Sequence, residues 1–82
     1  MYRLIYKSRA NRRIDWDLVN ELIGASEANN EEAGITGVLL ASDTHFLQVL
    51  EGGFDEINRL FLRIARDPRH EDVQLISFGC VE

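Results

Sequence analysis

A glutamine lies between two apolar residues in the segment FLQVLEGG, which runs from Phe46 to Gly53. Side chains alternate along a strand, so Phe46, Gln48 and Leu50 share one face, and the apolar neighbours predict that this face is buried. A buried amide without partners costs about 1–3 kcal/mol. We therefore expect Gln48 to hydrogen-bond to another polar group or to a ligand.

Further polar residues are predicted to lie near this glutamine. Tyr6 belongs to an alternating segment and is expected to face inward, although a strand tyrosine often packs and directs its hydroxyl to water. The apolar stripe of the first predicted helix, continued by three or four residues, leads to Ser26, Asn29 and Asn30. Alternatively, these residues cap a helix end that is leaving the core.

Arg63 and Asp67 stand four residues apart near the end of the second predicted helix. The simplest interpretation is a surface ion pair worth well under ~1 kcal/mol. Together with the phenol and the amides, they indicate a polar space between two helices above a sheet. Amide groups match the alternating donors and acceptors of a flat heteroaromatic edge, and aliphatic side chains suit the ring faces. A polar network that satisfies itself is the alternative.

Periodicity predicts the elements that position these residues. Apolar alternation predicts four strands, at residues 2–8, 35–41, 45–51 and 73–81. Helical spacing predicts two helices, residues 16–29 after the N-cap Asp15 and residues 54–66 before Pro68. The expected inward residues of the helices are Leu18, Val19, Leu22 and Ile23, then Phe54, Ile57, Leu60, Phe61 and Ile64. The order βαββαβ predicts an α+β, ferredoxin-like fold, with an antiparallel sheet and both helices on one face.

Composition narrows the classes of function. A single domain covering residues 1–82 is expected, and its net charge of −5 argues against general nucleic-acid binding. The lone Cys80 excludes a disulfide framework and a thiolate metal site. The chain has no signal-peptide core and no apolar run of membrane-spanning length, so we expect a cytoplasmic domain that does not bind membranes.

Charge is segregated near the N-terminus. Residues 1–13 carry five basic groups and no acid, and residues 14–32 carry six acids and no base. The simpler interpretation is two solvated surfaces that attract each other. The alternative is that the loop arginines Arg9, Arg12 and Arg13 meet an anionic ligand group or a partner.

Four motifs resemble the BLUF family, the sensors of blue light using FAD. They are Leu4-Ile5-Tyr6-Lys7-Ser8, Asn29-Asn30 followed by Gly34-Ile35-Thr36-Gly37, Phe46-Leu47-Gln48-Val49-Leu50-Glu51-Gly52, and Asp67-Pro68-Arg69-His70. The match covers nearly the whole chain in the family's order. Tyr6 precedes Asn30 by 24 residues, and Asn30 precedes Gln48 by 18, which is the family's spacing between its three key residues.

The resemblance implies roles for individual residues. Tyr6 matches the photochemical tyrosine, and Gln48 matches the glutamine between that hydroxyl and the flavin. The implied cofactor-binding residues are Asn30, Asn29, Gln48, Ser26, Ile35, Arg63 and Asp67. Among them, the two asparagines would hold the carbonyl and ring-NH edge, the arginine and the aspartate would lie near the pyrimidine side, and the serine and the isoleucine would line the pocket.

The expected function is that of a blue-light photoreceptor domain rather than an enzyme. Light would drive electron and proton transfer from Tyr6 to the flavin and leave the Gln48 side chain rotated or tautomerised. The expected cofactor is FAD, or alternatively FMN or riboflavin, with its phosphate tail near the loop arginines. The expected protein partners are a further copy of the chain and an output domain or separate partner.

Two other functions remain as alternatives. The first is a ferredoxin-like binding or oligomerisation module without flavin. The second, a small hydrolase, is disfavoured because the loop after the first strand has no phosphate-cradling glycine. The sequence also shows no nucleophile–base pair, since His45 and His70 are expected to be surface or structural residues.

The resemblance ends before the last strand of the family's fold. BLUF domains continue into a fifth strand, whereas this chain stops at Glu82 after the fourth predicted strand. We therefore expect a domain that is truncated at its C-terminal end, either as a fragment or as a shortened natural form.

Overall fold

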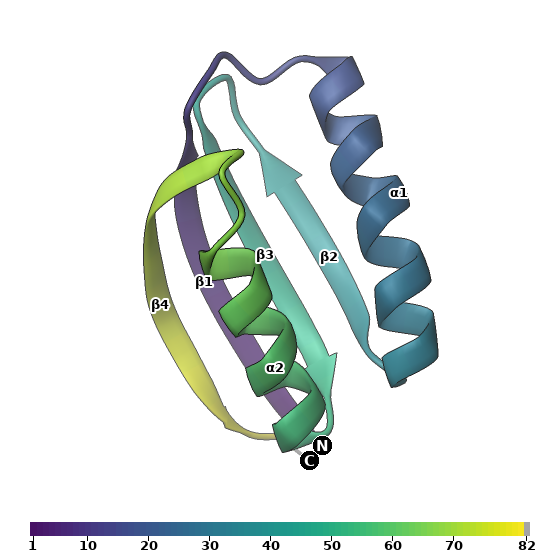
Figure 1. The fold of residues 1–82 in the computed structure, drawn as a ribbon. Coiled ribbons are helices and arrows are strands. Elements are labelled where there is room, and N and C mark those ends of the chain that lie inside the picture. The colour runs from purple at the N-terminus through teal and green to yellow at the C-terminus, as the bar shows by residue number, and fades with distance from the viewer. Residues whose placement is uncertain (82) are drawn as a thin grey trace.

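The structure, a computed structural model, describes residues 1–81, except for the side chains of residues 25–29 and 32. Its elements are β1 (Tyr2–Ala10), α1 (Trp16–Ala33), β2 (Thr36–Ala41), β3 (His45–Gly52), α2 (Phe54–Ala65) and β4 (His70–Cys80). This order is the predicted βαββαβ. Figure 1 shows α2 crossing the sheet in front of β1 and β3, and α1 running along β2.

The four strands form one antiparallel sheet in the order β2-β3-β1-β4. The inward face of β3 joins two core clusters. Phe46 packs with Leu18 of α1, and Leu50 packs with Ile57 of α2. Phe46 and Leu50 lie on the same face of their strand, so both helices cover the same face of the sheet, as predicted. The β1–β3 register places Tyr6 directly opposite Gln48.

Helix α1 begins where the sequence predicts and ends four residues later than predicted. The side chain of Asp15 caps the first turn by accepting a hydrogen bond of 2.8 Å from the backbone N–H of Leu18. At the other end, Gly34 adopts a left-handed conformation (φ 71°), and its N–H reaches the carbonyls of Asn30 and Glu31. A glycine in this conformation is the usual helix stop. The asparagine pair therefore lies inside the helix rather than at its end.

The expected inward stripe of α1 is wrong at Ile23. Leu18 is buried and Leu22 is half-buried, but Ile23 is 39% exposed. Helix α1 runs beside β2, at the edge of the sheet, and so presents only a narrow stripe to the core. Phe54 of α2 is also half exposed, and its remaining surface packs against Tyr2 and Phe78, with ring centroids 5.2 and 5.1 Å away.

Strand β4 begins at His70, three residues before the predicted start. Its pairing with β1 shifts register twice, between Ile5 and Tyr6 and between Lys7 and Arg9. Asp72, near the second shift, has a φ of 52°. These irregularities break the regular alternation from which strand ends are predicted. The earlier start matters because it brings His70 to the sheet.

Candidate functional site

The hydroxyl of Tyr6 donates a hydrogen bond of 2.5 Å to Oε1 of Gln48. Both side chains are buried, with exposures of 3% and 7%. The pairing register produces this contact, because directly opposed strand residues on one face lie within side-chain reach. Since Oε1 is the acceptor, the NH₂ group of Gln48 remains available as a donor. Burial raises the pKa of the Tyr6 phenol, and the nearby charge of Asp67 adds to this effect. The phenol is therefore neutral and keeps its proton at physiological pH.

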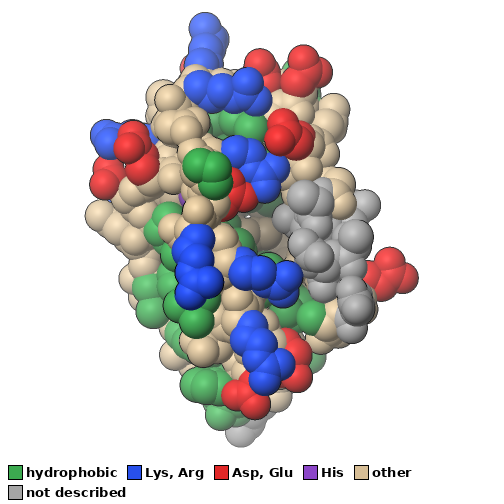
Figure 2. All heavy atoms as spheres, viewed as in Figure 1, with side chains coloured by type: hydrophobic (Ala, Val, Ile, Leu, Met, Phe, Trp, Pro, Cys, Tyr) green, Lys and Arg blue, Asp and Glu red, His purple; other side chains and the backbone are tan. Residues whose placement is uncertain are grey.

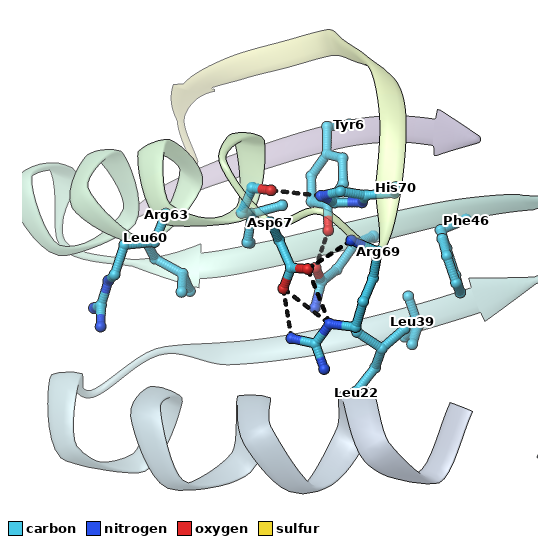
Figure 3. Close-up of a pocket in the computed structure, with 11 residues that line it drawn as sticks. Tyr6, Leu22, Leu39, Phe46, Leu60, Arg63, Asp67, Arg69 and His70 are labelled. Atoms are coloured by element: carbon cyan, nitrogen blue, oxygen red, sulfur yellow. Dashed lines mark hydrogen bonds and ion pairs between the residues drawn. The ribbon is translucent and has the colours of Figure 1, made fainter. Parts of the chain in front are cut away.

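A cavity lies beside this pair, between α1 and α2 (Figure 3). Its apolar lining residues are Leu22, Leu39, Phe46, Leu60 and Ile64. Its polar lining residues are Tyr6, Gln48, Arg63, Asp67, Arg69 and His70. Aliphatic walls with a few convergent polar groups are the usual character of a small-molecule site.

The carboxylate of Asp67 pairs with Arg69 rather than with Arg63. The Nε of Arg69 donates to both carboxylate oxygens, at 2.9 and 3.0 Å, and its backbone N–H donates to Oδ1 at 2.9 Å. These hydrogen bonds lower the pKa of the Asp67 carboxyl. The predicted pair between Arg63 and Asp67 is wrong because α2 ends at Ala65, so the i,i+4 geometry of a helix does not apply.

Arg69 also connects the two sides of the cavity. Its guanidinium lies 3.3 Å from the carboxylate of Glu21, which is on α1. Arg63 lines the cavity from α2 and forms no ion pair with any carboxylate that the structure describes. Figure 2 shows basic side chains gathered over the exposed face of α2, where the sequence places Arg59, Arg63 and Arg66. Of these three arginines, Arg63 lines the cavity.

Asn30 has an unpaired buried oxygen. Its Oδ1 has no hydrogen-bond partner among the described residues. The side chain lies next to Gly37 of β2 and is not among the residues that line the cavity. Capping does not explain Asn30, since Gly34 performs that role. An unsatisfied buried acceptor costs about 1–3 kcal/mol, and a ring N–H of a bound heteroaromatic group would relieve this cost.

Three other predicted binding residues, Ile35, Ser26 and Asn29, are not seen at the cavity in the described part of the structure. Ile35 is buried in the core with Leu50 and Ile57 and is not among the residues that line the cavity. The side chains of Ser26 and Asn29 lie outside the described part of the structure. Their roles, like that of Ile35, remain predictions.

Sequence reasoning about individual residues missed two polar residues of the cavity, Arg69 and His70. His70 was expected at the surface or in a structural role, but it is half-buried and lines the cavity. The available signal was the short segment Asp67-Pro68-Arg69, because an aspartate before a proline turn commonly accepts hydrogen bonds from residues just beyond it. For His70, only its place in the last of the four motifs pointed to the site.

The loop arginines do not border the cavity. Arg9 pairs with Glu71 and Asp72 at 3.2 and 3.0 Å, and Arg13 lies 4.0 Å from Asp43. Among the described residues, no ion pair joins the basic segment 1–13 to the acidic segment 14–32. The two segments therefore pair with other parts of the chain rather than with each other.

The chain matches known proteins along its whole length. Residues 1–82 match the model of the BLUF family, described as sensors of blue-light using FAD. The chain belongs to the BLUF family. Members of this family are flavin-binding sensors of blue light, and FAD is the cofactor by which the family is defined. A BLUF domain is a sensor module rather than a catalytic unit.

Curated relatives of this BLUF domain are larger proteins. It is 37% identical over 76 residues to photoactivated adenylate cyclase subunit beta of Euglena gracilis, covering 93% of this chain and 9% of that protein. It is 30% identical over 70 residues to the blue light- and temperature-regulated antirepressor BluF of Escherichia coli, covering 85% of this chain and 17% of that protein. The chain therefore spans less than a fifth of the length of these relatives.

Solved structures confirm the fold of the BLUF domain. The dark-state structure of the BLUF protein BlrB has a TM-score of 0.89 at 33% identity, and the match covers 98% of this chain and 61% of that one. Klebsiella pneumoniae BlrP1 with FMN and cyclic diGMP has a TM-score of 0.87 at 36% identity, covering 99% and 22%. In the described part of this BLUF domain, no helix is long and apolar enough to cross a membrane.

Proposed function

We propose that this BLUF domain senses blue light through the hydrogen-bonded pair Tyr6 and Gln48, with FAD held between α1 and α2. The observation that carries the proposal is the buried hydrogen bond of 2.5 Å between these two residues at the wall of the cavity. The bond joins a phenol to an amide in a position that faces the cavity, so the pair can act on a bound ring as well as satisfy its own buried polar groups.

The described residues fit a flavin ring. Oδ1 of Asn30 offers an unpaired acceptor to a ring N–H, and the NH₂ group of Gln48 offers a donor to a ring nitrogen or carbonyl. The apolar lining residues contributed by α1, β2 and α2 suit the two ring faces. In this proposal, Arg63 lies near the pyrimidine side, and Asn29, Ser26 and Ile35 complete the pocket.

When bound, FAD supplies a ring that becomes a strong oxidant on absorbing blue light. Tyr6 would then give one electron from its phenol to the excited ring, and this loss would acidify the hydroxyl. Its proton would pass along the hydrogen bond to Gln48 Oε1, and the NH₂ group of Gln48 would give a proton to the ring in exchange. Electron and proton afterwards return to Tyr6, so the phenol is restored and no net oxidation occurs. The lasting change is in Gln48, whose amide is left rotated or tautomerised.

The change at Gln48 is a switch that the sheet can transmit. Gln48 lies opposite Tyr6 of β1 on one side and opposite Leu39 of β2 on the other. An amide with two discrete hydrogen-bonding arrangements is a small bistable element at the centre of three strands. We propose that an output domain, a protein partner or a second copy of the chain senses this change, in the cytoplasm.

Absorption spectroscopy tests this function directly. The purified protein loaded with FAD should be yellow, should shift its flavin absorption to longer wavelength under blue light, and should return in the dark. Gln48→Leu is the matched control, because it keeps the volume and removes the group that rearranges. A protein that folds but binds no flavin would support the flavin-free binding module instead. A protein that binds flavin without a light-induced shift would exclude the proposed photochemistry.

A further inference from the structure

His70 joins three parts of the fold beside Tyr6. Its Nδ1 lies 2.9 Å from the hydroxyl of Ser8 on β1, and its Nε2 lies 2.5 Å from the backbone carbonyl of Ile64 near the end of α2. The imidazole also lies edge-on to the Tyr6 ring, with centroids 6.4 Å apart and planes at 85°. Figure 3 shows the ring of His70 beside that of Tyr6 at the wall of the cavity.

The chemistry of the two partners determines which nitrogen carries the proton. A backbone carbonyl can only accept, so Nε2 must be the N–H donor. In the neutral imidazole, Nδ1 is then an acceptor, and Ser8 donates its hydroxyl proton to it. Ser8 is 1% exposed, so this histidine supplies the partner that its buried hydroxyl requires.

The same hydrogen bonds tie α2 to the sheet. The Ile64 carbonyl belongs to the last turn of α2, whose carbonyls have no partner within the helix. It accepts from the backbone N–H of Asp67 at 3.0 Å and from His70. Phe61, one turn earlier on α2, also packs against Tyr6, with ring centroids 5.6 Å apart. The Tyr6 ring thus contacts both α2 and His70.

We propose that His70 is a positioning residue for Tyr6. Fixed as the Nε2–H tautomer by Ser8 and Ile64, its ring holds the phenol at the angle that keeps the hydroxyl on Gln48 Oε1. This role deepens the proposed function, and only the experiments with bound flavin rest on that function. Without flavin, the same role predicts a fixed histidine tautomer and a slowly exchanging Tyr6 hydroxyl proton.

Nuclear magnetic resonance of the flavin-free protein tests the geometry. The chain has two histidines, so ¹⁵N-histidine labelling gives two ring systems, and His45→Phe assigns them. His45 is exposed and hydrogen-bonds to its neighbour Thr44, so its removal leaves the cavity unchanged. In its neutral form, His70 should show an acceptor-type Nδ1 and a protonated Nε2. A protonated Nδ1, or the averaged signals of a free imidazole, would overturn the proposal.

Two variants separate the hydrogen bonds from the shape of the ring. His70→Phe keeps an aromatic edge and loses both hydrogen bonds, whereas Ser8→Ala removes only the Ser8 partner. Without flavin, His70→Phe should make the Tyr6 hydroxyl proton exchange too fast to observe. With FAD, the red shift per absorbed photon should fall roughly tenfold, because a small misplacement of a reacting group is costly. Ser8→Ala should show the same changes in weaker form.

A stability-matched control separates positioning from simple destabilisation. Ile57→Val loosens the core of α2 at a fully buried residue that does not line the cavity. It should lower the unfolding temperature while leaving the Tyr6 hydroxyl signal and the red shift intact. If His70→Phe behaves like Ile57→Val in both measurements, His70 is only structural. If the wild type shows no red shift, the proposed function fails, and the flavin-free measurements still decide whether His70 positions Tyr6.

Discussion

At the scale of single residues, the proposed flavin site depends on a few polar side chains with few hydrogen-bond partners. Tyr6 and Gln48 bond to each other, and Asn30 retains an unpaired acceptor among the described residues. Each of these residues could in principle be ordinary core, and substitutions that preserve shape distinguish the two roles.

Replacing Tyr6 by phenylalanine should retain flavin and abolish the light-induced red shift. The substitution removes the hydroxyl, and with it the proton and most of the donor ability, while the ring still packs against Phe61. Difference spectra before and after blue light measure the effect. Tyr2→Phe is the control, because Tyr2 packs on Phe54 and Phe78 and does not line the cavity. A normal photocycle in Tyr6→Phe would make Tyr6 a core residue only.

Replacing Asn30 by alanine should weaken flavin binding by up to roughly 100-fold, since the polar edge of the ring loses a buried partner worth about 1–3 kcal/mol. Fluorescence titration of FAD gives the dissociation constants. Asn20→Ala, an exposed asparagine earlier on the same helix, controls for changes in α1 itself. Equal affinities of wild type and Asn30→Ala would remove Asn30 from the binding site.

Replacing Gln48 by leucine should preserve the fold and most of the flavin affinity, because leucine suits the strand and the apolar wall. The dark spectrum should shift slightly, and illumination should produce no long-lived red-shifted state. Gln48→Glu keeps the shape and an acceptor without the NH₂ donor, and so reports whether the donor is needed. Unfolding of Gln48→Leu in the dark would assign Gln48 to a structural network. A normal photocycle would contradict its photochemical role.

At the scale of elements, the connection between α2 and β4 is held by the ion pair of Asp67 and Arg69. Arg69 also pairs with Glu21 of α1, so this connection links the two helices on either side of the cavity. The pairing also has a direct consequence for stability, because hydrogen bonds from Arg69 lower the pKa of the Asp67 carboxyl.

The stabilisation from Asp67 should therefore depend on pH. A carboxyl whose pKa is lower in the folded state stabilises the fold above its unfolded value of about 3.9, and this contribution disappears as pH falls through the folded pKa. Asp67→Asn should cost about 1 kcal/mol of unfolding free energy at pH 7, and the difference from wild type should vanish at acid pH. Urea unfolding at several pH values measures it. Asp43→Asn, in an exposed pair with Arg13 at 4.0 Å, should change stability little at any pH. A difference that persists at acid pH would mean that the pair is not the cause.

At the scale of the whole molecule, a domain of 82 residues buries a small core, which here divides into two clusters. The cavity lies between the two helices that contribute to these clusters, Leu18 belonging to one and Ile57 to the other. A ligand in that position would connect the two clusters and add to the stability of the folded state only.

FAD should therefore raise the unfolding temperature in a concentration-dependent way. At 100 times the dissociation constant, the gain is about 2.7 kcal/mol, which corresponds to roughly 10–20 °C for a domain of this size. Thermal unfolding at increasing FAD concentrations measures it. Asn30→Ala should need a higher FAD concentration for the same increase. An unfolding temperature that does not change with FAD would contradict binding in this cavity.

Local patterns in the sequence predicted most of the fold. Alternation in strands and three-to-four-residue spacing in helices depend only on neighbouring residues, so the element order and the inward positions of Tyr6 and Gln48 follow from the chain itself. The same local logic explains the errors. Ile23 belongs to an apolar stripe but lies on the helix beside an edge strand. Strand β4 begins earlier than predicted, and its pairing with β1 shifts register twice, which breaks the alternation that marks a strand end.

The composition of the site was decided by tertiary structure. Tyr6 bonds to a residue 42 positions away, and Ser8 bonds to His70, 62 positions away. Such contacts depend on strand register and on where a helix ends, which no local pattern specifies. Asp67 has Arg69 rather than Arg63 as its partner because α2 stops at Ala65. The sequence by itself determined that Tyr6 and Gln48 face inward, because alternation along a strand is local. The packing of distant segments determined that they meet each other and that Arg69 and His70 join them at the cavity.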